Sequence, residues 1–214
     1  MPELILFQGD SITDAVRLRE DERDVYSGHG YVTMISGKLG LTHPGKYTVR
    51  NRGVACERIV DIYARVKTDI INHKPDYVSL LVGVNDVLHG FSLNNGIDTK
   101  KFEMLYSLMI KEITEALPDV KIIILEPFIL EGECTSQKHG DNYPLIAKEI
   151  AEKASASKRI AEKYNLSFVP LQAEFDRLCN IQPPSYWLFD GIHPSPAGHA
   201  MIAEKWLEVF ERSV

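Results

Sequence analysis

Residues 4–13 (LILFQGDSIT) contain a candidate nucleophile. An apolar run of the kind that a buried strand shows breaks at Gly9 and delivers Asp10 and Ser11 into the following turn. A serine in this position is held still by the sheet and is open to a substrate, which suits a nucleophilic hydroxyl. Because Gly-Asp-Ser is also ordinary turn sequence, this interpretation requires three further parts: a base, an acid that orients it, and donors for an oxyanion.

The base and the acid can both come from one loop near the C-terminus. Asp190 and His193 form an Asp-x-x-His pattern, and a loop can bend so that the carboxylate accepts the Nδ1 proton of the imidazole. Nε2 is then free to take the proton from Ser11. Triads of this kind occur in several chain orders, so a serine first and an Asp–His pair last is allowed. The alternative is an aspartate–histidine pair in a surface turn before a helix.

The elements that must position these residues follow from the hydrophobic pattern. Strand patterns alternate with amphipathic helices along the whole chain. The expected strands cover residues 4–8, 46–50, 77–82, 120–128 and 167–171, and the expected helices cover residues 31–39, 59–70, 99–117, 143–164, 173–179 and 196–212. Gly40 is expected to end the first of these helices. Buried strands without in/out alternation, each followed by a covering helix, predict a three-layer α/β/α sandwich with a five-stranded parallel sheet.

In such a sheet, ligands bind beyond the carboxyl ends of the strands. Ser11, the turn at residues 51–53 and Asn85 each follow an expected strand, so we expect all three at this edge. Residues 14–30 come directly after Ser11, are dense in charge and contain two glycines near their end. They form either a solvated loop or the rim of the site.

Four short blocks together resemble the sequence blocks of the SGNH hydrolases, the GDSL-type esterases and lipases. They are residues 9–13 (GDSIT), 51–53 (NRG), 83–86 (GVND) and 190–194 (DGIHP), in the family's order and spanning nearly the whole chain. The resemblance implies a single SGNH domain over residues 1–214 with a flavodoxin-like sheet. It also implies that Ser11 is the nucleophile, His193 the general base and Asp190 its orienting acid.

The resemblance further implies an oxyanion hole made by the N–H groups of Ser11 and Gly53 and the side-chain amide of Asn85. Preorganised neutral donors stabilise the charge of a tetrahedral intermediate, whereas a carboxylate at position 85 would repel it. Two departures from the family pattern occur. Ile12 replaces a leucine, and residues 54–56 (VAC) stand where many relatives have small polar residues, which leaves Cys56 near the site without a role.

The composition fits one soluble globular domain and excludes several functions. The chain has 214 residues, of which 44% are hydrophobic and 25% charged, and its net charge of -6 argues against nucleic acid or an anionic membrane as the main partner. No apolar run is long enough for a membrane helix and no targeting pattern opens the chain, so we expect a cytoplasmic protein. The three cysteines form neither a disulfide framework nor a zinc pattern, and the triad needs no metal or other cofactor.

These observations predict a serine esterase. Residues 186–194 (YWLFDGIHP) and the first block are most similar to bacterial members that remove acetyl groups from sugars, so short-chain acyl esters, acetylated carbohydrate in particular, are the expected substrates. The alternatives are a lysophospholipase or thioesterase on the same triad, and a non-catalytic domain that binds carbohydrate or a partner. Tyr186, Trp187 and Phe189 form either a wall of the site or core packing. The oligomeric state stays open.

Three further polar side chains receive structural roles from the sequence. Asp10 is expected to hold the turn at Ser11 by accepting backbone N–H groups. His89 and His199 are expected to be surface or capping residues rather than additional bases.

Overall fold

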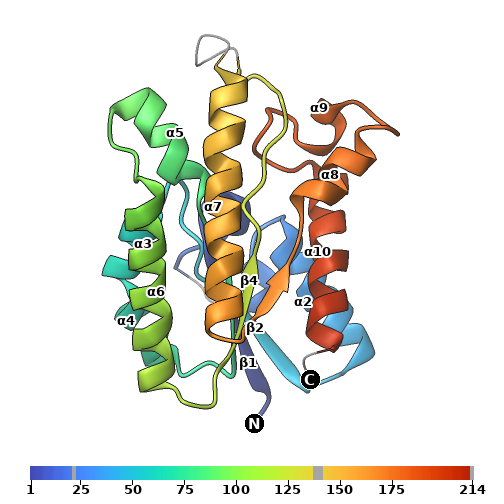
Figure 1. Ribbon diagram of the computed structural model, residues 1–214. Coiled ribbons are helices and arrows are strands. Elements are labelled where there is room, and N and C mark those ends of the chain that lie inside the picture. Colours follow the sequence, from blue (N-terminus) through green and yellow to red (C-terminus); the bar gives the residue numbers. More distant parts are fainter. Residues whose placement is uncertain (21–22, 137–141, 213–214) are drawn as a thin grey trace.

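A single parallel sheet forms the centre of the molecule (Figure 1). The computed structural model describes residues 1–20, 23–136 and 142–212. Within these residues the sheet has five strands in the order β2-β1-β3-β4-β5, and every neighbouring pair is parallel. The strands are β1 (Glu3–Gly9), β2 (Tyr47–Asn51), β3 (Tyr77–Leu81), β4 (Lys121–Leu125) and β5 (Ser167–Val169). The predicted sandwich is confirmed.

The strand order reverses at β1. The chain passes from β1 to β2 on one side and then returns to β3 on the other side. A crevice forms at such a switch point, because the connections leave the two neighbouring strands in opposite directions. Ser11 and Asn85 follow β1 and β3, the two strands that meet there, so the topology alone places them at the crevice.

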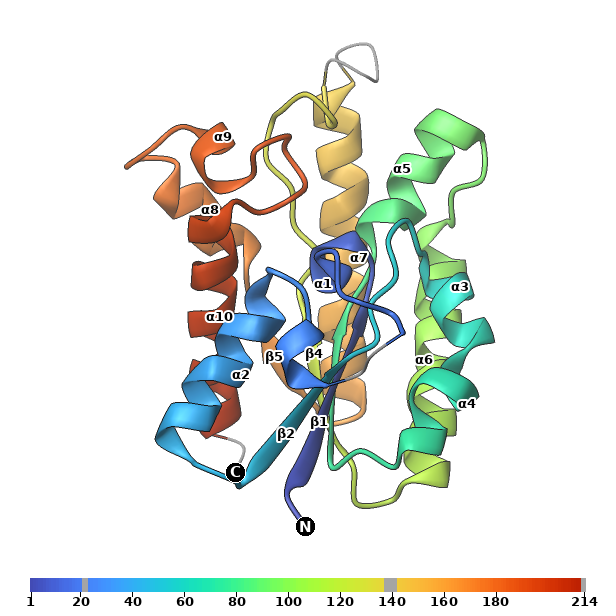
Figure 2. The same ribbon diagram turned by 180° about the vertical axis from the view of Figure 1, so that it is seen from behind.

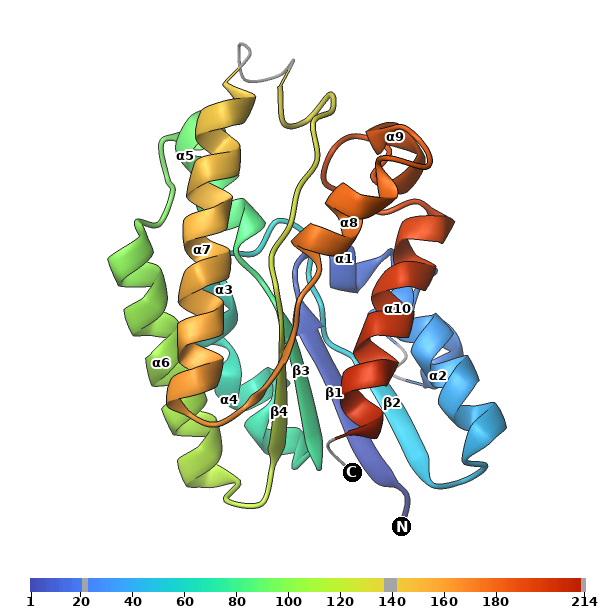
Figure 3. The ribbon, with the colours of Figure 1, turned by 45° about the vertical axis from the view of Figure 1, so that its right-hand side comes forward.

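Helices cover both faces of the sheet (Figures 2 and 3). One face carries α2 (Tyr31–Thr42) and α10 (Pro196–Glu211), and Phe7 of β1 packs there against Trp206 with ring centroids 5.1 Å apart. The other face carries α3 (Ile59–Ala64), α4 (Val66–Asp69), α6 (Thr99–Ala116) and α7 (Tyr143–Lys163), and Leu6 belongs to the buried cluster beneath them. Burial of apolar side chains on both faces stabilises the three layers.

Three local predictions differ from the structure. Gly40 does not end the helix that contains it, since α2 continues to Thr42. Its inner residues Tyr31, Val32, Ile35 and Leu39 are buried, and this packing outweighs the cost of about 1 kcal/mol for a helical glycine. The predicted helix at 59–70 is divided at Arg65 into α3 and α4.

The third difference is α5 (Val84–Leu93), a helix that is absent from those expected from the sequence. Its buried residues Val84, Val87 and Leu88 have helical spacing, a signal that the turn-like Gly-Val-Asn-Asp sequence obscured. The remaining elements are short: α1 (Ser11–Asp14), η1 (Asp24–Tyr26), η2 (Ile71–His73), α8 (Gln172–Leu178) and α9 (Pro184–Trp187). Among the described residues no helix is both long and apolar enough to span a membrane.

Candidate active site

Ser11 is the first residue of α1, which lies directly beyond the end of β1 (Figure 2). The Oδ1 atom of Asp10 accepts the N–H of Ile12 at 3.0 Å and caps this short helix, as predicted. Gly9 fits against β3 so closely that an added Cβ would lie 2.4 Å from the carbonyl oxygen of Leu81. The hydroxyl of Ser11 is therefore presented by a rigid strand–helix turn.

A hydrogen-bonded chain joins Ser11 to the C-terminal loop. Ser11 Oγ lies 2.9 Å from His193 Nε2, and His193 Nδ1 lies 2.7 Å from Asp190 Oδ2. The other oxygen, Asp190 Oδ1, accepts the backbone N–H groups of Ile192 and His193 at 2.9 and 2.8 Å. The three residues singled out by the sequence are thus in contact, and the orientation of the carboxylate is fixed through both of its oxygens.

These contacts keep Asp190 ionised. Burial alone would raise the pKa of the carboxyl, but the hydrogen bonds from the His193 ring and from two backbone N–H groups outweigh it and hold the pKa of Asp190 well below its usual range. A carboxylate that stays charged can retain the Nδ1 proton of the imidazole and leave Nε2 as the acceptor that faces Ser11.

The loop that carries Asp190 and His193 is held by the segment after β4. The backbone N–H of Leu130 donates to the carbonyl of Gly191 at 2.9 Å, and that of Cys134 donates to the carbonyl of Asp190 at 2.8 Å. Gly191 has φ +95°, and an added Cβ would lie 2.6 Å from Thr135 Oγ1. Glycine is required here by both the backbone conformation and the close approach.

Two neutral donors lie at the adjoining strand ends. Gly9 of β1 is paired with Leu81 of β3 in the sheet. Ser11 lies two residues after Gly9 and Asn85 lies four residues after Leu81, so both are at the same edge of the sheet. Asn85 is half-buried in the first turn of α5, and its Nδ2 donates to the carbonyl of Glu57 at 3.1 Å. An amide nitrogen has two protons, so one remains for a ligand. The N–H of Ser11 has no acceptor within the described residues.

Both backbone polar groups of Gly53 already form hydrogen bonds within the protein. Its N–H donates to Asn51 Oδ1 at 2.9 Å, and its carbonyl accepts from Arg17 Nε at 2.8 Å. An added Cβ would lie 2.5 Å from the backbone nitrogen of Asp14, so glycine is needed at position 53 because α1 packs against it. The N–H already has a partner, which contradicts the predicted place of Gly53 in an oxyanion hole.

Residues 54–57 form a turn beside the site. The N–H of Glu57 approaches the carbonyl of Val54 at 3.4 Å, and Cys56 has φ +68°, a conformation usually taken by glycine at the third position of such a turn. The N–H of Ala55 donates to Asp14 Oδ2 at 3.0 Å. Cys56 is exposed at the tip of this turn. Ala55 before it is hydrogen-bonded to α1, and Glu57 after it is hydrogen-bonded to Asn85.

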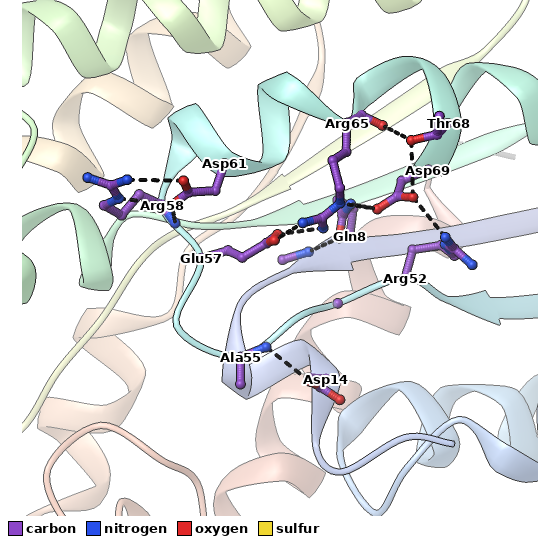
Figure 4. A network of polar contacts seen from close by, with 12 residues as sticks. Gln8, Asp14, Arg52, Ala55, Glu57, Arg58, Asp61, Arg65, Thr68 and Asp69 are labelled. Carbon is purple, nitrogen blue, oxygen red and sulfur yellow. Dashed lines mark hydrogen bonds and ion pairs between the residues drawn. The ribbon is translucent and has the colours of Figure 1, made fainter. Parts of the chain in front are cut away.

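A network of ion pairs supports this turn from the side of the sheet (Figure 4). The Glu57 carboxylate pairs with both terminal nitrogens of Arg65, the longer contact being 2.7 Å, and Arg65 Nε donates to Asp69 at 2.8 Å. Asp69 also accepts from Arg52 at 2.8 Å. Burial opposes ionisation of Asp69, but the hydrogen bonds from Arg52 and Arg65 outweigh it and lower the pKa of Asp69. The network thus fixes the residue whose carbonyl orients Asn85.

Two buried carboxyls lie behind the site. Burial raises the pKa of Asp10 to about 6 and that of Asp86 to about 7. Both carboxyl oxygens of Asp86 accept the N–H of Ile59, Oδ1 at 3.2 Å and Oδ2 at 3.1 Å, so this residue ties α5 to α3. Asp10 accepts the N–H of Ile12, as predicted, and Asp86 has the same kind of role toward Ile59.

A cavity of about 570 Å³ opens beside Ser11 and His193. Its wall includes Phe189, His199 and five residues between positions 14 and 19, so the segment after Ser11 forms part of the rim. Phe189 is 63% exposed and stacks on the His193 ring at 5.9 Å. Trp187 instead packs against the core, and its Nε1 donates to the carbonyl of Leu178 at 3.1 Å. One of the three predicted aromatic residues therefore faces the cavity.

His199 is a buried capping residue. Its Nδ1 accepts the N–H of Tyr31, the first residue of α2, at 3.2 Å. Burial, with smaller effects of His29 and His193, lowers the pKa of His199 to about 4. His89 does not line the cavity. In residues 1–20, 23–136 and 142–212, no group of three or more His, Cys, Asp or Glu side chains is arranged to hold a metal ion.

An α/β/α sandwich with a serine, a histidine and an aspartate joined at the switch point is an arrangement suited to ester hydrolysis. The chain belongs to the GDSL-like lipase/acylhydrolase family, whose sequence profile matches residues 7–201. With the relatives described next, this membership identifies a carboxylic ester hydrolase.

The relatives match almost the whole chain. An acetylxylan esterase from Geobacillus stearothermophilus is 32% identical over 212 residues, 96% of this chain and 92% of that protein. The crystal structure of Axe2, an acetylxylan esterase from the same organism, superimposes with a TM-score of 0.85 at 31% identity, covering 96% of this chain and 93% of that one. Solved variants of Axe2 described as catalytic mutants replace a serine, an aspartate and a histidine by alanine.

A structure from another organism is similarly close. A provisionally assigned GDSL-like lipase from Parabacteroides merdae ATCC 43184 has a TM-score of 0.90 at 30% identity, covering 98% of this chain and 95% of that one.

Proposed function

We propose that this esterase removes short acyl groups, acetyl above all, from carbohydrate through an acyl-enzyme formed on Ser11. The observation that carries the proposal is the unbroken chain from Ser11 Oγ through His193 to Asp190 at the wall of the cavity. The catalytic mutants of Axe2 alter the same three residue types, which supports these roles.

In the first step, Ser11 Oγ attacks the ester carbonyl carbon while His193 Nε2 takes the hydroxyl proton. The carbonyl electron pair moves to the oxygen, which accepts hydrogen bonds from the Ser11 N–H and the remaining Asn85 amide proton. Such donors act in the transition state because the charge develops there, and each typically contributes about 3 kcal/mol. Asp190 stabilises the imidazolium through the Nδ1 contact.

The tetrahedral intermediate then collapses. The bond between the carbonyl carbon and the alcohol oxygen breaks, and His193 gives its proton to that oxygen. Water next attacks the acyl-enzyme while His193 accepts a proton from it. The bond to Ser11 Oγ breaks, the proton returns to Ser11, and the acid leaves.

The acetyl preference is supported by the named activity of the relative that is 32% identical over 96% of this chain. A lysophospholipase or a thioesterase would use the same residues on longer or thioester substrates. A domain that only binds carbohydrate would not require a serine, a base and an acid in hydrogen-bonded order, so hydrolysis is the favoured function.

The test compares wild type with Ser11→Ala. We expect wild type to release acetate from acetylated xylo-oligosaccharides and to hydrolyse p-nitrophenyl acetate faster than its long-chain homologues. Ser11→Ala should lose at least 10³-fold in kcat and should not be labelled by a fluorophosphonate. A rate that rises with acyl length would favour the lipid alternative, and full activity of Ser11→Ala would exclude the proposed nucleophile.

A further inference from the structure

We propose that His199 is a substrate-binding residue, which donates an N–H hydrogen bond from Nε2 to an oxygen of the alcohol part of the ester. This inference rests on the proposed function and adds a contact that neither the sequence nor the comparisons assign. His199 lies on α10, is only 4% exposed, and lines the same cavity as Ser11 and His193.

The position of the proton on the imidazole follows from its partner. His199 Nδ1 is the acceptor of the Tyr31 N–H at 3.2 Å, so Nδ1 must present a lone pair. In a neutral imidazole the proton is then on Nε2. Burial lowers the pKa of His199 to about 4, with His29 and His193 acting in the same direction, so the neutral form is present at neutral pH.

The ring is also fixed in orientation. The absence of a side chain at Gly30 makes space for the ring, because an added Cβ there would lie 3.0 Å from His199 Cε1. Tyr31 stacks on the ring with centroids 6.3 Å apart. A donor that is held by a hydrogen bond and by packing is preorganised, which reduces the entropy lost when a ligand binds.

The Nε2 proton of His199 is available for a ligand. No acceptor for it occurs among the described residues. Nε2 is not among the fully buried side-chain atoms that lack a partner there, and His199 lines the cavity, so we infer that Nε2 faces the cavity. An N–H group in a largely apolar wall destabilises the protein unless an acceptor forms a hydrogen bond with it. In the free enzyme water would accept this hydrogen bond, and in the complex an oxygen of the substrate would accept it.

The cavity lies where the alcohol part of the ester is expected to bind, next to the His193 ring. The leaving oxygen must receive its proton from His193, so the alcohol occupies the space next to that ring. His193 and Phe189 line the cavity, whereas Asn85 is not among its described lining residues. The exposed Phe189 ring offers an apolar face and His199 a donor, and a sugar has both an apolar face and many oxygen acceptors.

Two variants separate binding from packing. His199→Asn can keep an acceptor for the Tyr31 N–H but has no donor at the Nε2 position. His199→Gln can place an amide N–H near that position but does not restore the cap. The readout is the ratio of kcat/KM for acetylated xylo-oligosaccharides to kcat/KM for p-nitrophenyl acetate, with thermal unfolding measured in parallel.

We expect His199→Asn to lower this ratio threefold to tenfold, mainly through KM for the sugar ester, as the loss of about one hydrogen bond predicts. His199→Gln should keep more of the ratio even where its unfolding temperature is lower. Calorimetry with acetylated xylotriose should show weaker binding to Ser11→Ala/His199→Asn than to Ser11→Ala.

A ratio that follows the unfolding temperature, or that is unchanged in both variants, would overturn the inference and leave only the cap. This result differs from failure of the proposed function, in which wild type itself would not release acetate from the sugar or Ser11→Ala would stay active.

Discussion

The side-chain amide of Asn85 donates to the backbone carbonyl of Glu57 at 3.1 Å, across 28 residues of chain. This bond makes the orientation of the proposed oxyanion donor depend on the turn at residues 54–57. The conformation of residues 54–57 depends on the ion pair between Glu57 and Arg65. The Glu57 side chain is 9% exposed and the Arg65 side chain is 34% exposed. The proposed oxyanion donor is therefore linked to ionic contacts whose residues, Glu57 and Arg65, are not among the described lining residues of the cavity.

The first prediction concerns Arg65. Arg65→Met leaves the largely buried Glu57 carboxylate without its partner, so we expect the turn to shift and kcat on p-nitrophenyl acetate to fall about tenfold, with KM changed less than twofold. Steady-state kinetics below the unfolding temperature give both constants. The matched control is Arg159→Met, which removes an exposed ion pair with Glu103 and should leave kcat unchanged. Equal effects of the two variants would contradict the link to Asn85.

The second prediction concerns Asp190. In Asp190→Asn the amide oxygen can still accept the two backbone N–H groups, so the loop should keep its shape. The amide nitrogen would then face His193 Nδ1 and favour the tautomer with its proton on Nε2, which cannot accept from Ser11. We expect kcat to fall by about 10⁴, as the same change does in a serine protease triad. An unchanged circular dichroism spectrum with a loss below tenfold would argue against this role of Asp190.

The third prediction is a pH dependence of stability that comes from Asp86. Burial, together with repulsion from Asp10, raises its folded pKa from 3.8 to about 7, although Lys153 and the Ile59 N–H oppose this. Between these values the folded state holds a proton that the unfolded state has lost, so stability falls as pH rises from about 4 to about 7. Each pKa unit corresponds to about 1.4 kcal/mol.

Asp86→Asn cannot ionise and removes this contribution. We expect the free energy of unfolding of wild type, relative to Asp86→Asn, to decrease by a few kcal/mol between pH 4 and pH 8, as measured by urea unfolding at several pH values. A difference that is constant across this range, or that increases with pH, would show that Asp86 is ionised in the folded protein at low pH.

The fourth prediction compares two glycines. Gly191→Ala adds a Cβ at φ +95°, 2.6 Å from Thr135 Oγ1 and 2.7 Å from the carbonyl oxygen of Leu130, so we expect a loss of about 1–3 kcal/mol and a lower kcat. Gly37→Ala lies inside α2 with open space around the new Cβ, and should stabilise by up to about 1 kcal/mol. Thermal unfolding of both variants provides the comparison. Similar changes in the two variants would contradict the predicted constraint at Gly191.

The sequence by itself determined the sheet and the three residues that the structure joins. The apolar runs before Ser11 and Asn85 are strands because their side chains are buried on both faces, and burial on both faces leaves a pattern that a single sequence displays. The Asp190–His193 contact is similarly local, since the two residues lie only three positions apart in one loop.

Only the tertiary structure decided which polar atoms remain available. Gly53 resembled a donor in sequence, but its N–H is taken by Asn51, and α1 packs against it. The sequence predicts that His199 is a surface or capping residue; it does cap α2, but only the fold buries it in the wall of the cavity. The physical reason is that local sequence governs the choice of helix or strand, whereas the partner of a particular N–H depends on segments that only folding brings together.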